Sequence, residues 1–151
     1  MLISKKFSTR FYEAYPNVFY GKNQSNFLEK EDINELLKIM KYRGNTVRYC
    51  LHEKITDLVH VSVIATNKAY PNNIHKHPRK IETIYALKGN ANLCLYGNDQ
   101  NDKEIKNLSS SNFSLIQIPK NTFHNFELIS NNFVFIEISE GPFNSESTLY
   151  K

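Results

Sequence analysis

From about residue 46 onward, short apolar runs alternate with clusters of turn-forming residues. The runs are rich in Val, Ile, Phe and Tyr, which favour the pleated, half-buried surface of a β-sheet. Several short strands at regular spacing are typical of an all-β sandwich or barrel. We predict strands at 59–65, 82–88, 91–96, 113–118, 124–129 and 133–138, separated by turns that contain Gly, Pro, Asn or Ser.

Residues 29–42 have the periodicity of a helix. The apolar residues Ile33, Leu36, Leu37 and Met40 recur at positions i, i+3, i+4 and i+7, which predicts one apolar face. Acidic residues lie near the start of this segment and basic residues near its end, where each sign favours the helix dipole. Gly44 follows, as is typical after the last turn of a helix.

Residues 1–28 show no such period, and we predict an irregular segment there. It carries several aromatic residues among polar ones, a composition that is uncommon in disordered tails. We therefore expect it to pack on the body of the protein or on a second subunit. The chain is read as one structural domain, with an N-terminal segment and helix over 1–45 packed on a β-barrel over 46–151.

The composition excludes several classes of protein. The formal net charge of +4 comes from scattered lysines and arginines, whereas a nucleic-acid-binding protein gathers its cations on one face. The two cysteines, Cys50 and Cys94, each lie in an apolar stretch, so we expect buried free thiols. The N-terminus lacks the apolar region of a signal peptide, and no apolar run is long enough to span a membrane. We therefore expect a soluble cytoplasmic protein with no nucleic-acid or membrane partner.

Two histidines two residues apart mark the most informative stretch of the chain. On a strand, the side chains of His75 and His77 point to the same face. Two protonated imidazoles at close range repel each other, whereas both can bind a cation that lies between them. Pro78 cannot extend a central strand. The chain is therefore expected to turn there and to bring the Glu82 carboxylate back to the same site.

A further ligand is expected from a strand distant in sequence. The turn that begins at Pro119 leads to His124, at the start of a predicted strand. Three imidazoles and one carboxylate suit Fe, Mn, Co, Ni, Cu or Zn, and they leave coordination positions for water or substrate. We therefore predict one divalent metal ion on His75, His77, Glu82 and His124. Its chemistry would be that of a Lewis acid, an activator of water or, with iron, of O₂.

These residues also carry a resemblance to a known family. The series His75-x-His77-x₄-Glu82-x₆-Gly89 resembles the first sequence motif of the cupins, with its spacing intact. The resemblance implies a double-stranded β-helix, the jelly-roll barrel of that family, with a short helical element at its N-terminus.

The second cupin motif is matched in part by Pro119-x-Asn121-x-x-His124. Asn121 stands where the family usually has Gly, and Phe113 and Leu128 stand where it has Gly and Asn. Because Asn tolerates positive φ better than most residues, we expect the turn before His124 to survive.

A closer resemblance is to the WbuC-type cupin metalloproteins, over roughly residues 29 to 143. Those proteins combine a short N-terminal helix, an Arg- and Asn-containing segment ending in His, the first motif, and a Glu-x-x-x-Gly-Pro ending; the corresponding stretches here are 43–52 and 137–143. The resemblance implies that the four residues above are the metal ligands. It also implies surface-polysaccharide (O-antigen or capsule) biosynthesis, and cupins commonly form homodimers.

Other residues are candidates for contact with a small-molecule substrate. Glu137 lies between two isoleucines of a predicted strand, where it either points into the cavity as a catalytic base or lies at a strand edge. His52 is a second candidate for proton transfer. Arg48, with His52, could bind an anionic group such as a phosphate, or could form a surface salt bridge. Tyr85 and Tyr96 either line the cavity or belong to the core.

Three functions stay open at this point. One is a metal-dependent isomerase or epimerase of a sugar or sugar nucleotide, in which Glu137 or His52 moves the proton. Another is an iron-dependent dioxygenase of a small organic molecule. The last is a cupin that binds a sugar without catalysis. The identity of the metal separates the first two, and ligand binding without turnover would indicate the third.

Overall fold

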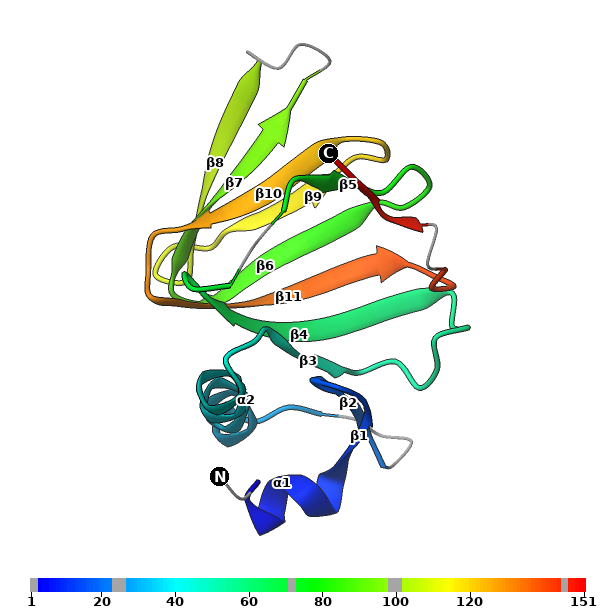
Figure 1. Ribbon diagram of the computed structural model, residues 1–151, viewed down its shortest axis with the longest axis vertical. Helices are drawn as coiled ribbons and strands as arrows, with labels where there is room; N and C mark the ends of the chain where they lie inside the picture. Colours follow the sequence, from blue (N-terminus) through cyan, green and yellow to red (C-terminus); the bar gives the residue numbers. More distant parts are fainter. Residues whose placement is uncertain (1–2, 23–26, 71–72, 98–101, 145–146) are drawn as a thin grey trace.

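Two β-sheets face each other, and the helices lie on the outer side of one of them (Figure 1). The structure is a computed structural model and describes residues 3–22, 27–70, 73–97, 102–144 and 147–151. The larger sheet contains, in spatial order, β1 (Phe11–Tyr15), β2 (Val18–Gly21), β3 (Val47–Cys50), β4 (Val59–Asn67), β11 (Asn132–Glu140), β6 (Glu82–Lys88) and β9 (Leu115–Ile118). The smaller sheet contains β12 (Leu149–Tyr150), β5 (His75–Lys76), β10 (Phe123–Leu128), β7 (Asn90–Tyr96) and β8 (Lys103–Ser109).

Strand alternation divides each strand of the larger sheet between two environments. In β11, Phe133 and Phe135 pack in the apolar cluster between the sheets, whereas Val134 belongs to a second cluster on the opposite face. Leu93 and Phe126 of the smaller sheet complete the cluster between the sheets. Phe126 and Phe135 also line a cavity, so this apolar cluster forms the floor on which the functional site is built.

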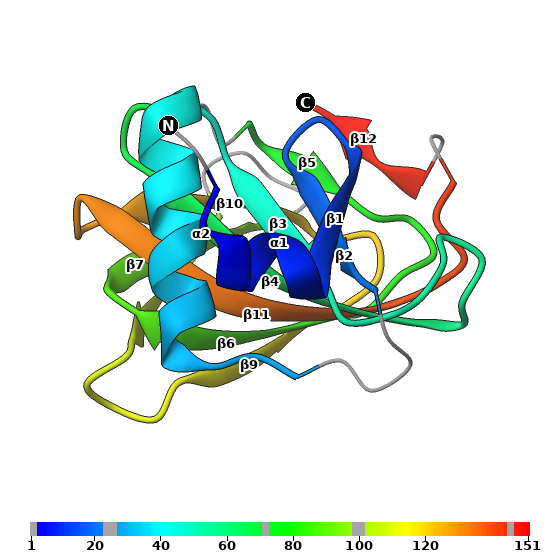
Figure 2. The same cartoon turned by 90° about the horizontal axis from the view of Figure 1, so that it is seen from below.

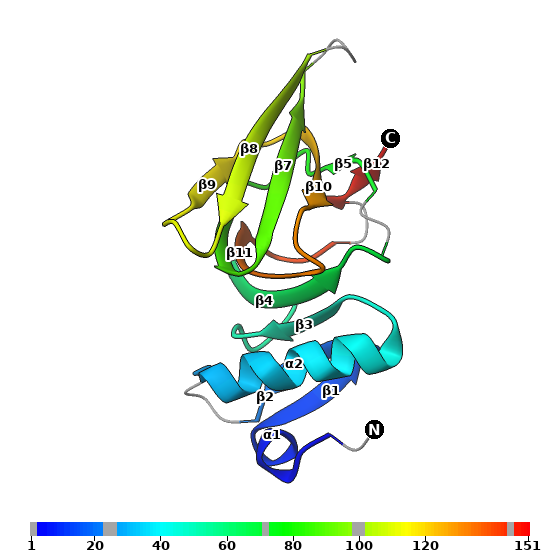
Figure 3. The ribbon, with the colours of Figure 1, turned by 90° about the vertical axis from the view of Figure 1, so that its left-hand side faces the viewer.

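The predicted helix is confirmed as α2 (Lys30–Arg43), which lies across the outer side of the larger sheet (Figures 2 and 3). The Glu29 N–H donates to the Asp32 carboxylate at 2.8 Å, which closes the first turn. Gly44 ends the helix with φ of 62°, a conformation that glycine adopts without steric cost. Leu36 and Met40 are fully buried, so the apolar face predicted from the sequence is the face that packs on β3 and β4.

The N-terminal segment is not irregular, and that prediction is wrong. It forms α1 (Lys5–Arg10) followed by β1 and β2, and β2 pairs in parallel with β3. Such short elements leave no periodic signal, because tertiary contacts stabilise them. Phe7 and Phe19 are buried in the core beside α2, and Arg10 donates to both oxygens of the buried Asp32 at 3.0 and 2.8 Å. The expectation that the aromatic residues of this segment pack on the body of the protein is confirmed for four of them, whereas Tyr12 and Tyr15 are exposed.

The predicted strands agree with the observed ones to within a few residues, but β3, β12 and β8 have no counterpart among them. The longest of the three is β8. Residues 103–107 of this strand are all exposed, and most are polar. A charged edge strand of this kind protects a sheet from pairing with another chain. Because it buries little, it lacks the apolar alternation by which strands are recognised in a sequence.

The two cysteines lie in different sheets, Cys50 on β3 and Cys94 on β7. Both are free and buried, as predicted. Neither helix in the described part of the chain has the length and apolar character needed to cross a membrane.

Candidate metal centre

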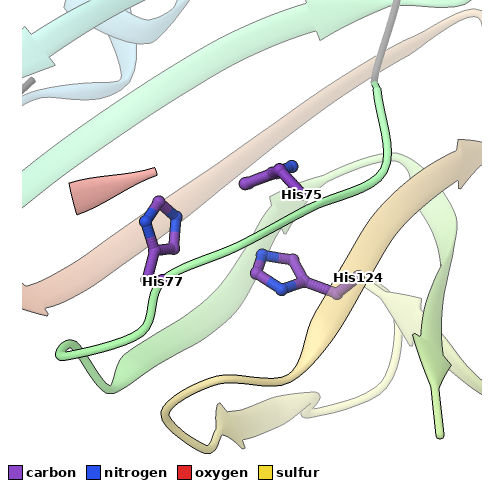
Figure 4. Close-up of side chains that lie close together, drawn as sticks. All are labelled: His75, His77 and His124. Carbon is purple, nitrogen blue, oxygen red and sulfur yellow. The ribbon is translucent and has the colours of Figure 1, made fainter. Parts of the chain in front are cut away.

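Three imidazoles converge between the two sheets (Figure 4). His75 on β5 and His124 on β10 are direct cross-strand partners in the smaller sheet. His77 follows β5, just before the bend that begins at Pro78. One ring nitrogen of each histidine lies within 4.8 Å of those of the other two. The fold thus brings together three histidines from two distant stretches of the sequence.

The backbone orients all three rings in the same way. Each Nδ1 lies 2.8 to 2.9 Å from a carbonyl oxygen, that of Asn73 for His75, of Ser147 for His77 and of Thr122 for His124. A carbonyl oxygen only accepts hydrogen bonds, so each Nδ1 carries the proton. The Nε2 lone pair of each ring is therefore left for a ligand, which is the arrangement typical of metal-binding histidines.

Glu82 begins β6 in the larger sheet and completes the set of donors. Its Oε1 lies 3.1 Å from His77 Nε2, and its Oε2 lies 3.1 Å from His124 Nε2. A carboxylate oxygen and an imidazole lone pair repel each other unless a proton or a cation lies between them. A divalent cation satisfies all four groups without protonating adjacent imidazoles, so this donor set fits a metal ion.

The pKa values of these groups reflect the same competition between a proton and a cation. Burial raises the pKa of Glu82, but hydrogen bonds from His124 and His77 outweigh it and lower that pKa to about 2. Burial lowers the pKa of His77, but the Glu82 carboxylate outweighs it and raises that pKa. Burial, together with the charges of the other two histidines, lowers the pKa of His75. The ionised Glu82 carboxylate therefore favours a positive charge beside it, whether that of a proton or of a cation.

Two cavities meet at these ligands. The inner cavity, of about 270 Å³, has an apolar floor that includes Ile84, Phe126 and Phe135. The outer cavity, of about 720 Å³, extends toward β2, β3 and the C-terminal strand. The residues that line both cavities are His75, Glu82, Arg48, Glu137 and Tyr150. The candidate metal centre therefore lies where a small inner cavity joins a larger outer one.

Glu137 lies on the inner face of β11, two positions after Phe135, and faces both cavities. Its side chain is 20% exposed, and its Oε1 lies 3.9 Å from Arg48 Nη1. Burial raises the pKa of Glu137; the charge of Arg48 opposes this shift, and the charge of Glu82 adds to it. Of the two alternatives for this residue, the structure shows the one that faces the cavity.

His52 lines the outer cavity, where its ring stacks on that of His60 at 4.1 Å between centroids. The Val61 N–H donates to His52 Nδ1 at 3.2 Å, and the Tyr20 hydroxyl lies 3.5 Å from its Nε2. Burial lowers the pKa of both histidines. The imidazole of His52 therefore lines the outer cavity mainly in its neutral form, with its two ring nitrogens held by Tyr20 and Val61.

The two tyrosines proposed from the sequence lie away from the site. Tyr85 is on the outer face of β6, against the ring of Phe113 at 5.6 Å. Tyr96 is on the outer face of β7, where its hydroxyl donates to Asn125 at 3.0 Å. Neither ring lines either cavity, which corrects their predicted role. Strand alternation decides this, because the inner face of β6 is the one that carries Glu82.

Sequence reasoning missed two residues of the outer cavity, Lys80 and Tyr150. Lys80 lies two positions before Glu82, a spacing that could have suggested a shared face. Tyr150 had no such signal, since it reaches the site only because β12 pairs with β5 and places it opposite His75.

Comparison with known proteins identifies the fold. No protein-family model matches the chain, and no curated protein matches it. The capsular polysaccharide assembling protein CapF from Staphylococcus aureus matches with a TM-score of 0.58 and 18% identity, over 68% of this chain and 31% of that chain. Oxalate decarboxylase from Lactobacillus farciminis matches with a TM-score of 0.56 and 16% identity, over 70% and 31%. Oxalate decarboxylase from Bacillus subtilis matches with 0.55 and 18%, over 70% and 28%.

These matches, together with the two facing sheets, decide the architecture. The chain has a cupin fold. It spans about a third of the length of each of these three solved structures. Asn121 has φ of 63°, so the cupin turn before His124 forms without the usual glycine, as predicted. Gly89 has φ of 82°, and a Cβ there would lie 2.3 Å from the Asn132 carbonyl oxygen, so this motif position requires glycine.

Proposed function

We propose that this cupin binds one divalent metal ion on His75, His77, Glu82 and His124 and isomerises or epimerises a sugar or sugar nucleotide. The observation that carries the proposal is the set of Nε2 atoms and the carboxylate converging beside an open cavity. The resemblance to WbuC-type cupins and the likeness to CapF, a capsular polysaccharide assembling protein, support surface-polysaccharide biosynthesis as the setting. The oxalate decarboxylase of Bacillus subtilis has Mn(II) centres, and manganese is among the ions that suit the donors of this chain.

Glu137 is the residue proposed to move a proton. When bound, the cation would polarise a carbonyl oxygen of the sugar and so acidify the C–H next to that carbonyl, whose electron pair the carbonyl accepts when the proton leaves. Glu137 faces the same space, and its raised pKa makes it a stronger base than an ordinary carboxylate once it has ionised. It would remove the proton from carbon and return it, and a return to the opposite face inverts the centre.

Two further residues would support this step. Arg48 lies 3.9 Å from Glu137 and limits the freedom of its carboxylate. His52 remains a second candidate for proton transfer on the wall of the outer cavity, although both of its ring nitrogens face partners in the protein. Separate substitutions of Glu137 and His52 therefore show which of the two transfers the proton.

The test uses deuterium exchange. Metal-loaded protein is incubated in D₂O with a panel of nucleotide sugars whose sugar ring carries a carbonyl group, and proton NMR follows the loss of signal at the carbons next to that carbonyl. We expect exchange with at least one of them. Glu137→Gln should slow exchange by about 10²-fold or more at unchanged metal content. The wild-type rate should rise with pH through a pKa above that of an ordinary carboxyl, and the variant should lack this rise.

Glu127→Gln is the matched control, because Glu127 lies exposed on β10 and pairs with Lys103. It should retain the wild-type rate. If deuterium exchange persists in Glu137→Gln but is lost in His52→Gln, then His52 and not Glu137 transfers the proton. The absence of exchange with every sugar, combined with turnover of an unrelated substrate class, would contradict the proposed function.

A further inference from the structure

Lys80 places an unbalanced positive charge on the wall of the outer cavity. Its ammonium lies 5.4 Å from the centroid of the Phe143 ring. Within the described residues, no carboxylate comes within ion-pair distance of it, although eight other lysines and arginines form such pairs. A half-buried ammonium without a counterion is costly, and a ligand anion would offset that cost.

Arg48 adds a second cation to the same cavity. Its only ion pair in the described part of the chain is the long contact of 3.9 Å with Glu137, and 40% of its side chain is exposed. A guanidinium offers five donors in a planar fork, so most of its hydrogen-bonding capacity faces the cavity. Arg48 and Lys80 both interact electrostatically with Glu137, and all three side chains line the outer cavity.

The groups near Arg48 and Lys80 give the outer cavity a net positive charge. Arg48 interacts electrostatically with His52, and Lys80 with His60, so the stacked imidazoles bridge the two cations along one wall. His60 is buried and His52 is half-buried, and burial lowers the pKa of both imidazoles, which favours their neutral form. The acidic groups that face the cavity are Glu82, which belongs to the metal centre, and Glu137. With a divalent ion bound, the net charge is positive even when both carboxylates are ionised.

We propose that Arg48 and Lys80 bind an anionic group, a carboxylate or a phosphate, of the molecule whose sugar portion reaches the metal centre. This inference rests on the proposed function for its substrate, and it narrows that substrate to a uronic acid, a sugar phosphate or a sugar nucleotide. The remaining walls fit such a molecule, because Tyr20, Phe143 and Tyr150 offer flat apolar surfaces on which a sugar ring can pack. A neutral sugar would leave Lys80 without an ion pair among the described residues and Arg48 with only its long contact to Glu137.

The experiment compares three probes that share one ring. Glucuronate carries a carboxylate, glucose 1-phosphate carries a phosphate, and glucose carries neither. Each is titrated calorimetrically into the whole metal-loaded chain. We expect at least one anion to bind about tenfold more tightly than glucose, since a hydrogen bond to a charged group contributes about 1.5 to 3 kcal/mol. The probe that binds more tightly than glucose shows whether the recognised group is a carboxylate or a phosphate. Raising the salt concentration should weaken the binding of that probe.

Variants assign the effect to the two cations. Lys80→Ala and Arg48→Gln should each weaken the anion by about tenfold and leave glucose unchanged, and Arg48→Lys should restore part of the loss. Lys88→Ala is the control, because Lys88 is an exposed lysine at the other end of β6, and it should bind like the wild type. Metal content is measured on every protein before titration, so that a disturbed metal site is recognised independently.

Equal affinity for all three probes, or anion binding that neither cation variant weakens at full metal content, would overturn this inference. That result would leave metal binding and sugar turnover standing. Conversely, anion binding that depends on both cations, without turnover of any sugar, would support the inference and contradict the proposed enzyme.

Discussion

The two faces of the larger sheet have opposite chemistry although the same strands build both. Toward α2, Val63, Ala65 and Val134 are buried at 0 to 1% exposure in an apolar cluster. Toward the smaller sheet, the intervening residues of β4 and β11 include Ser62 and Glu137, which line the outer cavity. Alternate residues of one strand therefore contribute to stability and to function. A substitution on one face of the sheet can test either property separately.

The largest effect should come from the metal ligands. His124→Ala removes a donor whose ring is almost fully buried, and we expect metal affinity to fall by about 10³-fold or more, because loss of a direct ligand should exceed the roughly 10- to 100-fold loss that follows removal of a supporting group. The metal-dependent gain in melting temperature should disappear with it. Elemental analysis and thermal melts measure both quantities. Unchanged metal content in His124→Ala and in His75→Ala would refute the ligand assignment.

Substitution on the helix face should have the reverse outcome. Leu36→Ala opens a cavity beneath α2 at a fully buried position and should lower the free energy of unfolding by about 2 to 5 kcal/mol. Metal affinity, measured well below the melting temperature, should stay at the wild-type value. If Leu36→Ala loses the metal while still folded, the two faces are coupled and the comparison fails.

The C-terminal strand should have an intermediate effect on the metal. Residues 147–151 supply the carbonyl oxygen that orients His77, and β12 pairs with β5 on both sides of His75. Ending the chain at residue 146 should weaken metal binding by about 10- to 100-fold, as measured by competition with a chelator. Lys151→Ala is the control, because it keeps the backbone N–H that donates to Ile74. Full affinity in the shorter chain would show that the ring of His77 needs no support from this strand.

The smallest effect concerns one polar atom on the helix face. Tyr49 is fully buried, and its hydroxyl has no hydrogen-bond partner among the described residues; burial raises its pKa to about 12. Tyr49→Phe removes this unpaired group and should raise the free energy of unfolding by about 1 kcal/mol. Denaturant titration measures the change. A clear loss of stability would show that the hydroxyl has a partner in solution, such as a bound water.

The class of fold and the shared face of His75 and His77 were within reach of the sequence because both depend on local patterns, whereas His124 was assigned from the turn before it and from its resemblance to the second cupin motif. The apolar stripe of α2 and the alternation of the central strands reflect burial of one face, and the spacing of His75, His77 and Glu82 follows from a strand, a proline and a turn. The N-terminal strands and β8 were missed for the opposite reason. The N-terminal strands are stabilised by the pairing of β2 with β3, and β8 is an edge strand that buries almost nothing.

The sequence by itself determined the class of fold and the chemistry of the donors, since periodicity and spacing are properties of neighbouring residues. Only the tertiary structure decided which side chains surround those donors. It turned Tyr85 and Tyr96 outward, brought Glu137, Arg48 and Lys80 to one cavity, and placed the Ser147 carbonyl against His77. The physical reason is that strand register and sheet closure join residues far apart in the chain, and a shift of one residue would exchange the inner and outer faces.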